Sequence, residues 1–373
     1  MTGARNRGGF LPTRVKREDW EDTKQSRGAL GRLFTLHGAS LEAMWAPHAG
    51  KSTRACRVRG GGYAGPMSRH ARKSLFLLVE TLGIFAGLAC AAAFALRSLP
   101  AGVAWPAMGI LAVLQGLWFD RMYTVSHEAV HGKLFPTARR LNDLVGALLV
   151  TPILAPFTIY RRIHGFHHGG NRRDPETAAL DHFKVPAGAS RAVRLRCRIL
   201  WSFYVFGGGF FLHSLVTVLV FLAVPRRAAE RISPLFRAWP MRLRLRAWAE
   251  FAGGLALHAA VWLLGGATLW LALLGLPLLV FAWVWSLLLY IYHYRTPVGP
   301  DVRHNVRSLP PHPFFSWLLL NFNEHATHHR DPSIPWYALP ERRYTPPSPV
   351  TDARNVWQAV WQQRRGPILW SAD

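Results

Sequence analysis

The sequence feature that most constrains the fold is a series of long apolar segments. Residues 74–96 and 101–119 form one adjacent pair of such segments, and residues 247–271 and 272–292 form a second pair. An α-helix needs about 20 apolar residues to cross a hydrocarbon core of about 30 Å. Each segment is therefore long enough for a span. The sequence predicts an all-α integral membrane protein with two transmembrane hairpins, about four spans in total.

Other parts of the apolar pattern do not fit straight spans. Residues 144–157 are too few to cross a bilayer and contain two prolines, so we expect an interfacial or buried helix. Residues 199–224 contain three consecutive glycines and precede an arginine-rich segment, which favours the cytoplasmic side. We expect 199–224 to lie in the interface, or to re-enter and turn back at the glycines. In the second hairpin we expect the turn near Gly275 and Pro277.

Composition narrows the class of protein. The chain has 373 residues, 50% hydrophobic and 17% charged, with 45 Lys+Arg against 20 Asp+Glu and a net charge of +25. Such a charge would suit a nucleic-acid-binding protein. The charged fraction, however, is below the usual value of about 25%, and a soluble protein would not need the long apolar segments. The hydrophobic content excludes disorder of the whole chain, and three widely spaced cysteines exclude a disulfide scaffold. We expect a membrane protein with basic aqueous segments and no nucleic-acid partner.

The distribution of positive charge predicts an orientation. Arg69, Arg72 and Lys73 precede the first hairpin and Arg121 follows it, whereas the turn contains only Arg97. The positive-inside rule places both flanks in the cytoplasm. We therefore expect the functional site on the cytoplasmic face. The motifs at residues 126–132 and 140–143 resemble those of bacterial proteins, which suggests the bacterial inner membrane. The expected divisions are a basic, disordered tail, a main membrane domain and a C-terminal cytoplasmic tail, at residues 1–73, 74–345 and 346–373.

Three clusters of histidines dominate the polar segments. In the first cluster, His127 and His131 are four residues apart and share one helix face. In the other two clusters, one histidine is followed by two more at three and four residues. These clusters are His164, His167 and His168, and His325, His328 and His329. Imidazoles on one helix face can hold a metal ion, so we predict a metal site on a cytoplasmic helical cap. Isolated histidines are expected to have ordinary structural roles: His182, His213, His258 and His312.

The number of clustered histidines restricts the metal chemistry. The first cluster also matches the zinc-protease pattern His-Glu-x-x-His, with Glu128 as general base. Such a protease needs about three protein ligands, which would leave the other two clusters unused. Imidazole-rich sites without thiolates suit iron, zinc or copper, and the clusters suit two ions. Two redox metals with open positions in a membrane protein indicate oxygen chemistry. A basic membrane-binding protein without catalysis is the non-enzymatic alternative.

The order of the clusters resembles the membrane fatty acid desaturase/hydroxylase superfamily, which includes carotenoid ketolases and sphingolipid desaturases. The clusters follow the second apolar segment, precede the third and follow the fourth, and the resemblance covers roughly residues 75–345. It implies a catalytic domain with a di-iron centre, that is two Fe, and O2 as co-substrate. The resemblance implies that the eight clustered histidines are iron ligands. It adds one more histidine after the fourth span, for which we favour His293 over His304.

The resemblance also suggests residues around the iron ligands. Some members have an asparagine four residues before the added histidine, where this chain has Leu289, and Asn321 or Asn323 could approach the metals instead. We expect four carboxylates to accept the far N–H of a ligating imidazole: Glu128, Asp174, Glu324 and Asp331. We expect the arginines around the second cluster to balance carboxylates, bind lipid phosphates or meet an acidic electron carrier: Arg161, Arg162, Arg172 and Arg173.

The reaction implied by the resemblance is the O2-dependent introduction of a double bond into a lipid acyl chain. Hydroxylation starts from the same C–H cleavage, so a hydroxylase or ketolase of a carotenoid or other hydrocarbon stays open as an alternative. The chain has neither a rubredoxin-like Cys-x2-Cys pair nor the His-Pro-Gly-Gly motif of cytochrome b5. Electrons are therefore expected from a separate ferredoxin, or from cytochrome b5 with its reductase.

Overall fold

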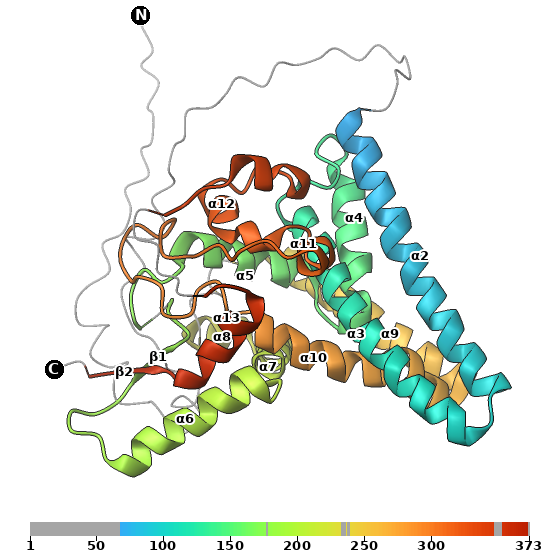
Figure 1. Ribbon diagram of the computed structural model, residues 1–373, viewed down its shortest axis with the longest axis horizontal. Coiled ribbons are helices and arrows are strands. Elements are labelled where there is room, and N and C mark those ends of the chain that lie inside the picture. The colour runs from blue at the N-terminus through green and yellow to red at the C-terminus, as the bar shows by residue number, and fades with distance from the viewer. Residues whose placement is uncertain (1–67, 177, 233–235, 237–238, 347–352, 372–373) are drawn as a thin grey trace, which may run out of the picture. The chain divides into compact units, whose positions relative to one another are not determined.

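The computed structural model describes residues 68–176, 178–232, 236, 239–346 and 353–371, and this part of the chain is mostly helical (Figure 1). Its longer helices are α2 (Arg69–Ser98), α3 (Ala101–Val130), α4 (Arg139–Val150), α5 (Phe157–Gly170), α6 (Arg191–Phe206), α7 (Gly209–Ala223), α9 (Met241–Trp270) and α10 (Leu276–Leu288). Its shorter helices are α8 (Arg226–Ile232), α11 (Pro313–Leu318), α12 (His325–Arg330) and α13 (Val356–Gln362). Strands β1 (His182–Lys184) and β2 (Ile368–Trp370) form a parallel pair. Tight 3-10 turns cover Thr151–Ile153, Phe322–Glu324, Trp336–Ala338, Pro340–Arg342 and Gln363–Arg365.

The first predicted hairpin is present as α2 and α3. The side chain of Ser68 caps α2 by accepting a hydrogen bond from the amide of Ala71 (3.1 Å), and Pro100 precedes the first residue of α3. Both helices have 30 residues and are long and apolar enough to cross a membrane. Helix α2 begins at Arg69, so its first turn includes residues that the sequence assigned to the N-terminal tail. The rest of that predicted tail lies outside the described residues.

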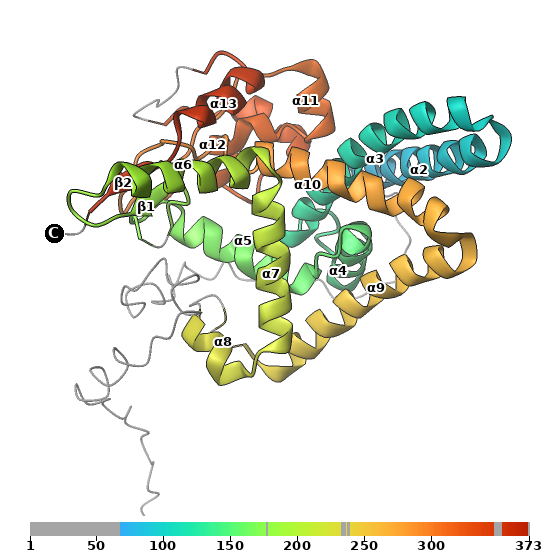
Figure 2. The ribbon, with the colours of Figure 1, turned by 90° about the horizontal axis from the view of Figure 1, so that it is seen from below.

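The second predicted hairpin is a long helix with a sharp bend. The combined segment Met241–Leu288 passes the same length and composition test, which gives three candidate spans. Its turn is not near Gly275 and Pro277 as predicted. It is at Gly266, where φ is 74° and the helix is interrupted, and Leu271–Gly275 then continues as a π-helix. Glycine adopts this backbone conformation without the steric cost of a Cβ atom. In Figures 1 and 2 the bends of both hairpins lie on the same side of the described region.

Two further helix pairs are bent rather than straight. Helices α6 and α7 meet at 86° across Gly207 and Gly208, which confirms the predicted break at the glycines. Helices α4 and α5 meet at 99°. The predicted single helix over 144–157 is therefore wrong, because the chain turns at Leu154 (φ 56°) and a new helix begins after Pro156. If each bent pair is one broken span, the number of candidate spans rises from three to five.

Helix α3 is at the centre of the main core. It packs against α2, α4 and α10, and a Cβ atom on Gly116 would lie 2.6 Å from the side chain of Val280 on α10. The absence of a side chain at Gly116 thus allows α3 and α10 to approach closely. The segment predicted as the C-terminal tail supplies α13 and β2. It is joined to the body by the β1–β2 pair and by a hydrogen bond from Trp201 Nε1 to the Gln363 carbonyl (2.7 Å).

Candidate metal centre

The structure brings all three histidine clusters and His293 together in two adjacent groups. In each group the candidate ligand atoms lie within 4.8 Å of one another. The first histidine group contains His127, His131, His164, His168 and His328. The second histidine group contains His167, His293, His325 and His329. The two groups include no thiolate and no carboxylate, so their donor set is entirely imidazole.

Helix geometry explains how one cluster serves both groups. Residues four apart lie on nearly the same helix face, whereas a residue three apart is displaced to one side. His164 and His168 accordingly belong to the first group, and His167 between them belongs to the second. The third cluster has the opposite assignment. His325 and His329 belong to the second group, and His328 belongs to the first.

The Nε2 atoms of these histidines point toward one another. The Nε2 atom of His164 lies 2.9 Å from that of His127, 2.8 Å from that of His131 and 2.9 Å from that of His168. In the second group, the Nε2 atoms of His293 and His325 are 3.0 Å apart. Because neutral imidazole binds a metal through a ring nitrogen, this convergence fits one metal ion in each group.

Burial keeps the imidazoles in the form that binds metal. His325, His328 and His329 on α12 are each at most 3% exposed. Their burial lowers the pKa of all three side chains well below the usual value of 6.5, and neighbouring histidines lower it further. At neutral pH these rings are therefore uncharged and able to act as ligands.

Phe322 packs against both histidine groups. Its ring centroid lies 5.0 Å from that of His127 and 4.4 Å from that of His325, so one side chain contacts a member of each group. The Tyr292 ring centroid lies 4.7 Å from that of His325 and 5.6 Å from that of Phe322. Two aromatic rings that contact each other thus pack on His325.

The structure separates the two candidates for the ninth ligand. His293 is 2% exposed and belongs to the second group. His304 belongs to neither group. Its Nδ1 atom is 2.6 Å from the hydroxyl oxygen of Tyr344, and its Nε2 atom is 3.2 Å from Asp301. The Leu289 side chain supplies no polar atom, while Asn321 and Asn323 hydrogen-bond to Trp336 and Ser316, respectively.

The structure shows several polar contacts of the carboxylates that we predicted to accept hydrogen bonds from the imidazoles. Glu128 accepts hydrogen bonds from Lys133 Nζ (2.9 Å) and the amide of Trp336 (3.2 Å), and its nearest contact with His127 Nδ1 is 3.8 Å. Glu324 contacts Asn323, and Asp331 accepts from Ser333. Asp174 is half-buried and belongs to neither group. The role of these carboxylates as imidazole partners therefore stays a prediction.

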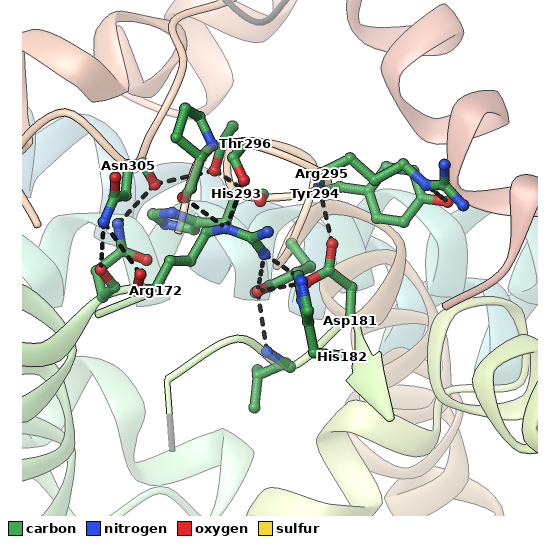
Figure 3. Close-up of polar contacts among 12 residues, drawn as sticks. Arg172, Asp181, His182, His293, Tyr294, Arg295, Thr296 and Asn305 are labelled. Atoms are coloured by element: carbon green, nitrogen blue, oxygen red, sulfur yellow. Dashed lines mark hydrogen bonds and ion pairs between the residues drawn. The ribbon is translucent and has the colours of Figure 1, made fainter. Parts of the chain in front are cut away.

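A buried ion pair holds the segment that carries His293 (Figure 3). Arg172 and Asp181 are both fully buried and pair through the guanidinium NH1 and the carboxylate. Arg172 also donates to the hydroxyl of Tyr290 (2.8 Å) and to the carbonyl of Thr296 (3.0 Å). These two residues flank His293 in the chain. The pair thus connects the end of the second cluster to the loop that presents His293.

Further contacts complete this network (Figure 3). The amide of Arg295 donates to Asp181 (2.8 Å). Asn305 donates to the carbonyl of Arg172 (3.0 Å), and Thr296 donates to the carbonyl of His293 (2.9 Å). No role for Asp181, Tyr290 or Asn305 at the site was predicted from the sequence. The position of Asp181 next to His182 in the predicted catalytic domain is a weak sequence signal. It does not indicate that Asp181 pairs with Arg172.

The remaining predicted arginines and isolated histidines have ordinary contacts. Arg161 pairs with Asp143 (2.9 Å), and Arg173 donates to the carbonyl of Gly169 (3.0 Å). His182 Nδ1 is 3.0 Å from Asp181, and His258 Nε2 is 2.9 Å from the carbonyl of Pro152. The isolated histidines lie outside both groups.

Comparison with known proteins identifies the family. The family model for "Fatty acid desaturase" matches residues 103–346, which is more than half of the chain and includes both histidine groups. The chain belongs to the fatty acid desaturase family. This agrees with the resemblance found in the order and spacing of the three histidine clusters.

Several curated relatives are omega-3 desaturases. The chain is 26% identical over 291 residues to the chloroplastic omega-3 fatty acid desaturase of Glycine max, covering 72% of this chain and 59% of the relative. It is 27% identical over 268 residues to the sn-1 acyl-lipid omega-3 desaturase (ferredoxin) of Nostoc sp. (strain 36), covering 71% of this chain and 60% of the relative. This chain therefore matches about three fifths of the length of each of these two relatives.

Proposed function

We propose that the chain uses O2 to introduce a double bond into the acyl chain of a membrane lipid, with two iron ions bound by nine histidines. The single observation that carries this proposal is the convergence of these histidines into two adjacent groups. The family assignment and the acyl-lipid substrates named for relatives support it. When bound, the irons would supply the activation of O2 that is needed to attack an unactivated C–H bond.

The protein's own contribution is to hold and shield this site. The neutral imidazoles of the first group come from α3 and the residue that follows it, from α5 and from α12, so the packing of these three helices fixes their separation. The second group adds His293, which the Arg172–Asp181 network restrains. Phe322 packs against both groups. A rigid site that excludes water is what positioning of a methylene group requires.

The environment of Glu128 favours this reading over a zinc protease. A general base of the His-Glu-x-x-His pattern directs a carboxylate oxygen toward a water molecule on the metal. The Glu128 carboxylate is instead directed toward Lys133 and the Trp336 amide. His127 and His131 also share their group with three further imidazoles, more than a catalytic zinc site uses.

The first test is lipid and pigment analysis of cells that express the wild-type chain or His131→Ala. We expect a new double bond in the lipids of wild-type cells and its loss in the variant, because His131 belongs to the first group. His213→Ala serves as the control, since His213 lies outside both groups. A new hydroxyl or keto product with unchanged acyl unsaturation would instead identify a hydroxylase or ketolase. Identical lipids and pigments with and without the wild-type chain would contradict an oxygenase.

The electron donor and the orientation can be tested together. A ferredoxin is named for the Nostoc relative, and we propose a separate acidic donor of this kind on the cytoplasmic side. The proposed orientation rests on the low positive charge of the two hairpin bends. The turn between α2 and α3 has Arg97 as its positive residue, and the bend around Gly266 has no charged residue, so both bends are placed outside the cytoplasm. Ferredoxin and its reductase should support desaturation when added to inside-out inner-membrane vesicles but not to intact right-side-out vesicles. Equal turnover in both, or turnover without a donor protein, would contradict this proposal.

A further inference from the structure

A pocket of about 800 Å³ lies beside the first turns of α2, outside both histidine groups. Its basic side is formed by Arg69, Arg72 and Lys73, which have the i, i+3, i+4 spacing of one helix face. Its apolar side includes Phe76 and Trp317. The pocket thus combines a cluster of cations with an apolar surface, a combination suited to an amphiphilic anion.

The three cations have no carboxylate partner within the described part of the chain. Glu80 is the acidic residue of the lining, but it is bound to Arg121 (2.7 Å) and to Trp317 Nε1 (2.8 Å). Lys73 contacts only an aromatic face, with its Nζ atom 3.7 Å from the ring centroid of Tyr337. Among the residues that the structure describes, the local charge of the pocket is therefore positive and uncompensated.

The position of these cations adds a second argument. The N-terminal end of a helix carries a partial positive charge, so cations there are unfavourable and anions are stabilised. The first turn of α2 contains no acidic residue. An anion in the pocket would relieve the repulsion among the cations and also meet the helix dipole.

The surroundings of the pocket indicate a lipid-bound anion. Leu75, Phe76 and Val79 are 46%, 72% and 64% exposed on α2, a candidate span, so the pocket adjoins a surface suited to hydrocarbon. The opposite wall is connected to the first histidine group. Trp336 in this wall donates its backbone amide hydrogen to the carboxylate of Glu128, the residue that follows His127.

We propose that this pocket binds a phosphate group of the molecule that carries the acyl chain to be desaturated. The proposal rests on the proposed desaturase function and adds that the preferred substrate is anionic. A phosphate of this kind occurs in a membrane phospholipid such as phosphatidylglycerol and in a soluble acyl-CoA. It is absent from an uncharged galactolipid, which makes the three carriers suitable probes.

The test measures binding of three ligands with the same acyl chain to the full-length purified protein. The ligands are phosphatidylglycerol, acyl-CoA and monogalactosyldiacylglycerol. The variant is Arg72→Gln/Lys73→Gln. The matched control is Arg139→Gln/Arg140→Gln, which removes two exposed arginines from the start of α4 outside the pocket. Removing two surface cations is expected to weaken binding of a phosphate carrier on the order of 30-fold.

The proposal requires tighter binding of at least one phosphate carrier than of the galactolipid, lost in the pocket variant and kept in the control. The phosphate carrier that binds more tightly identifies the source. The same preference in the wild-type protein should weaken as salt rises, and this measurement needs no variant. Equal affinity for all three ligands, or equal losses in the two double variants, would overturn the proposal. Because binding is measured without turnover, its failure is distinguishable from absence of desaturase activity.

Discussion

Replacing His293 by alanine is expected to lower lipid desaturation by at least about 100-fold, because loss of a direct ligand should exceed the 10- to 100-fold effect typical of residues that only orient a ligand. His293 is buried, and its Nε2 atom lies 3.0 Å from that of His325. Its removal leaves three imidazoles in the second histidine group while the first group keeps all five. We therefore expect the variant to lose metal from the second group preferentially.

His304→Ala is the matched control for this prediction. His304 was the other sequence candidate and lies only eleven positions further along the chain, but its ring contacts Tyr344 and Asp301. Its replacement should leave desaturation within about twofold of wild type, as for a surface change away from the site. Comparable losses in both variants, measured as double-bond formation per purified chain, would contradict the assignment of His293.

Replacing Asp181 by leucine is expected to destabilise the protein by about 3–5 kcal/mol, because it leaves the guanidinium of Arg172 buried without its carboxylate. Both residues are fully buried, so water cannot solvate the remaining charge. The loss should also loosen the 290–297 segment, since Asp181 accepts the amide hydrogen of Arg295. The measurement is the free energy of unfolding in detergent.

Glu176→Gln provides the comparison for the buried pair. Glu176 pairs with Lys184 at 2.9 Å, but the lysine side chain is half exposed. Exposed ion pairs contribute about 0–1 kcal/mol, so this variant should unfold almost as wild type does. A loss below 1 kcal/mol in Asp181→Leu, similar to that in Glu176→Gln, would show that the Arg172 network does not stabilise the His293 loop.

Features with a local cause could be predicted from the sequence. The spacing of His164, His167 and His168 within one helix determines that these rings project together, and the apolar length of α2 and α3 determines that they can span a membrane. The break of α6 and α7 follows from consecutive glycines. Each of these features depends on neighbouring residues alone, so the sequence contains the necessary information.

Features that depend on distant partners could not be predicted in the same way. Glu128 has the sequence position of an imidazole partner, but folding brings Lys133 and the Trp336 amide to its oxygens. Asp181 contacts Arg172 through a loop whose path no periodic pattern indicates. By contrast, the bend at Gly266 has a local signal in the glycine pair Gly265-Gly266, which the prediction of a turn near Gly275 and Pro277 overlooked.

Metal analysis of the purified full-length protein tests the central claim most directly. The structure offers one all-imidazole group of five histidines and one of four, with separate sets of ligand atoms. We expect one iron in each group, hence about two irons per chain, and zinc well below one per chain. A single zinc per chain, or a chain that retains no metal when purified with iron present, would contradict the account of two histidine-bound irons.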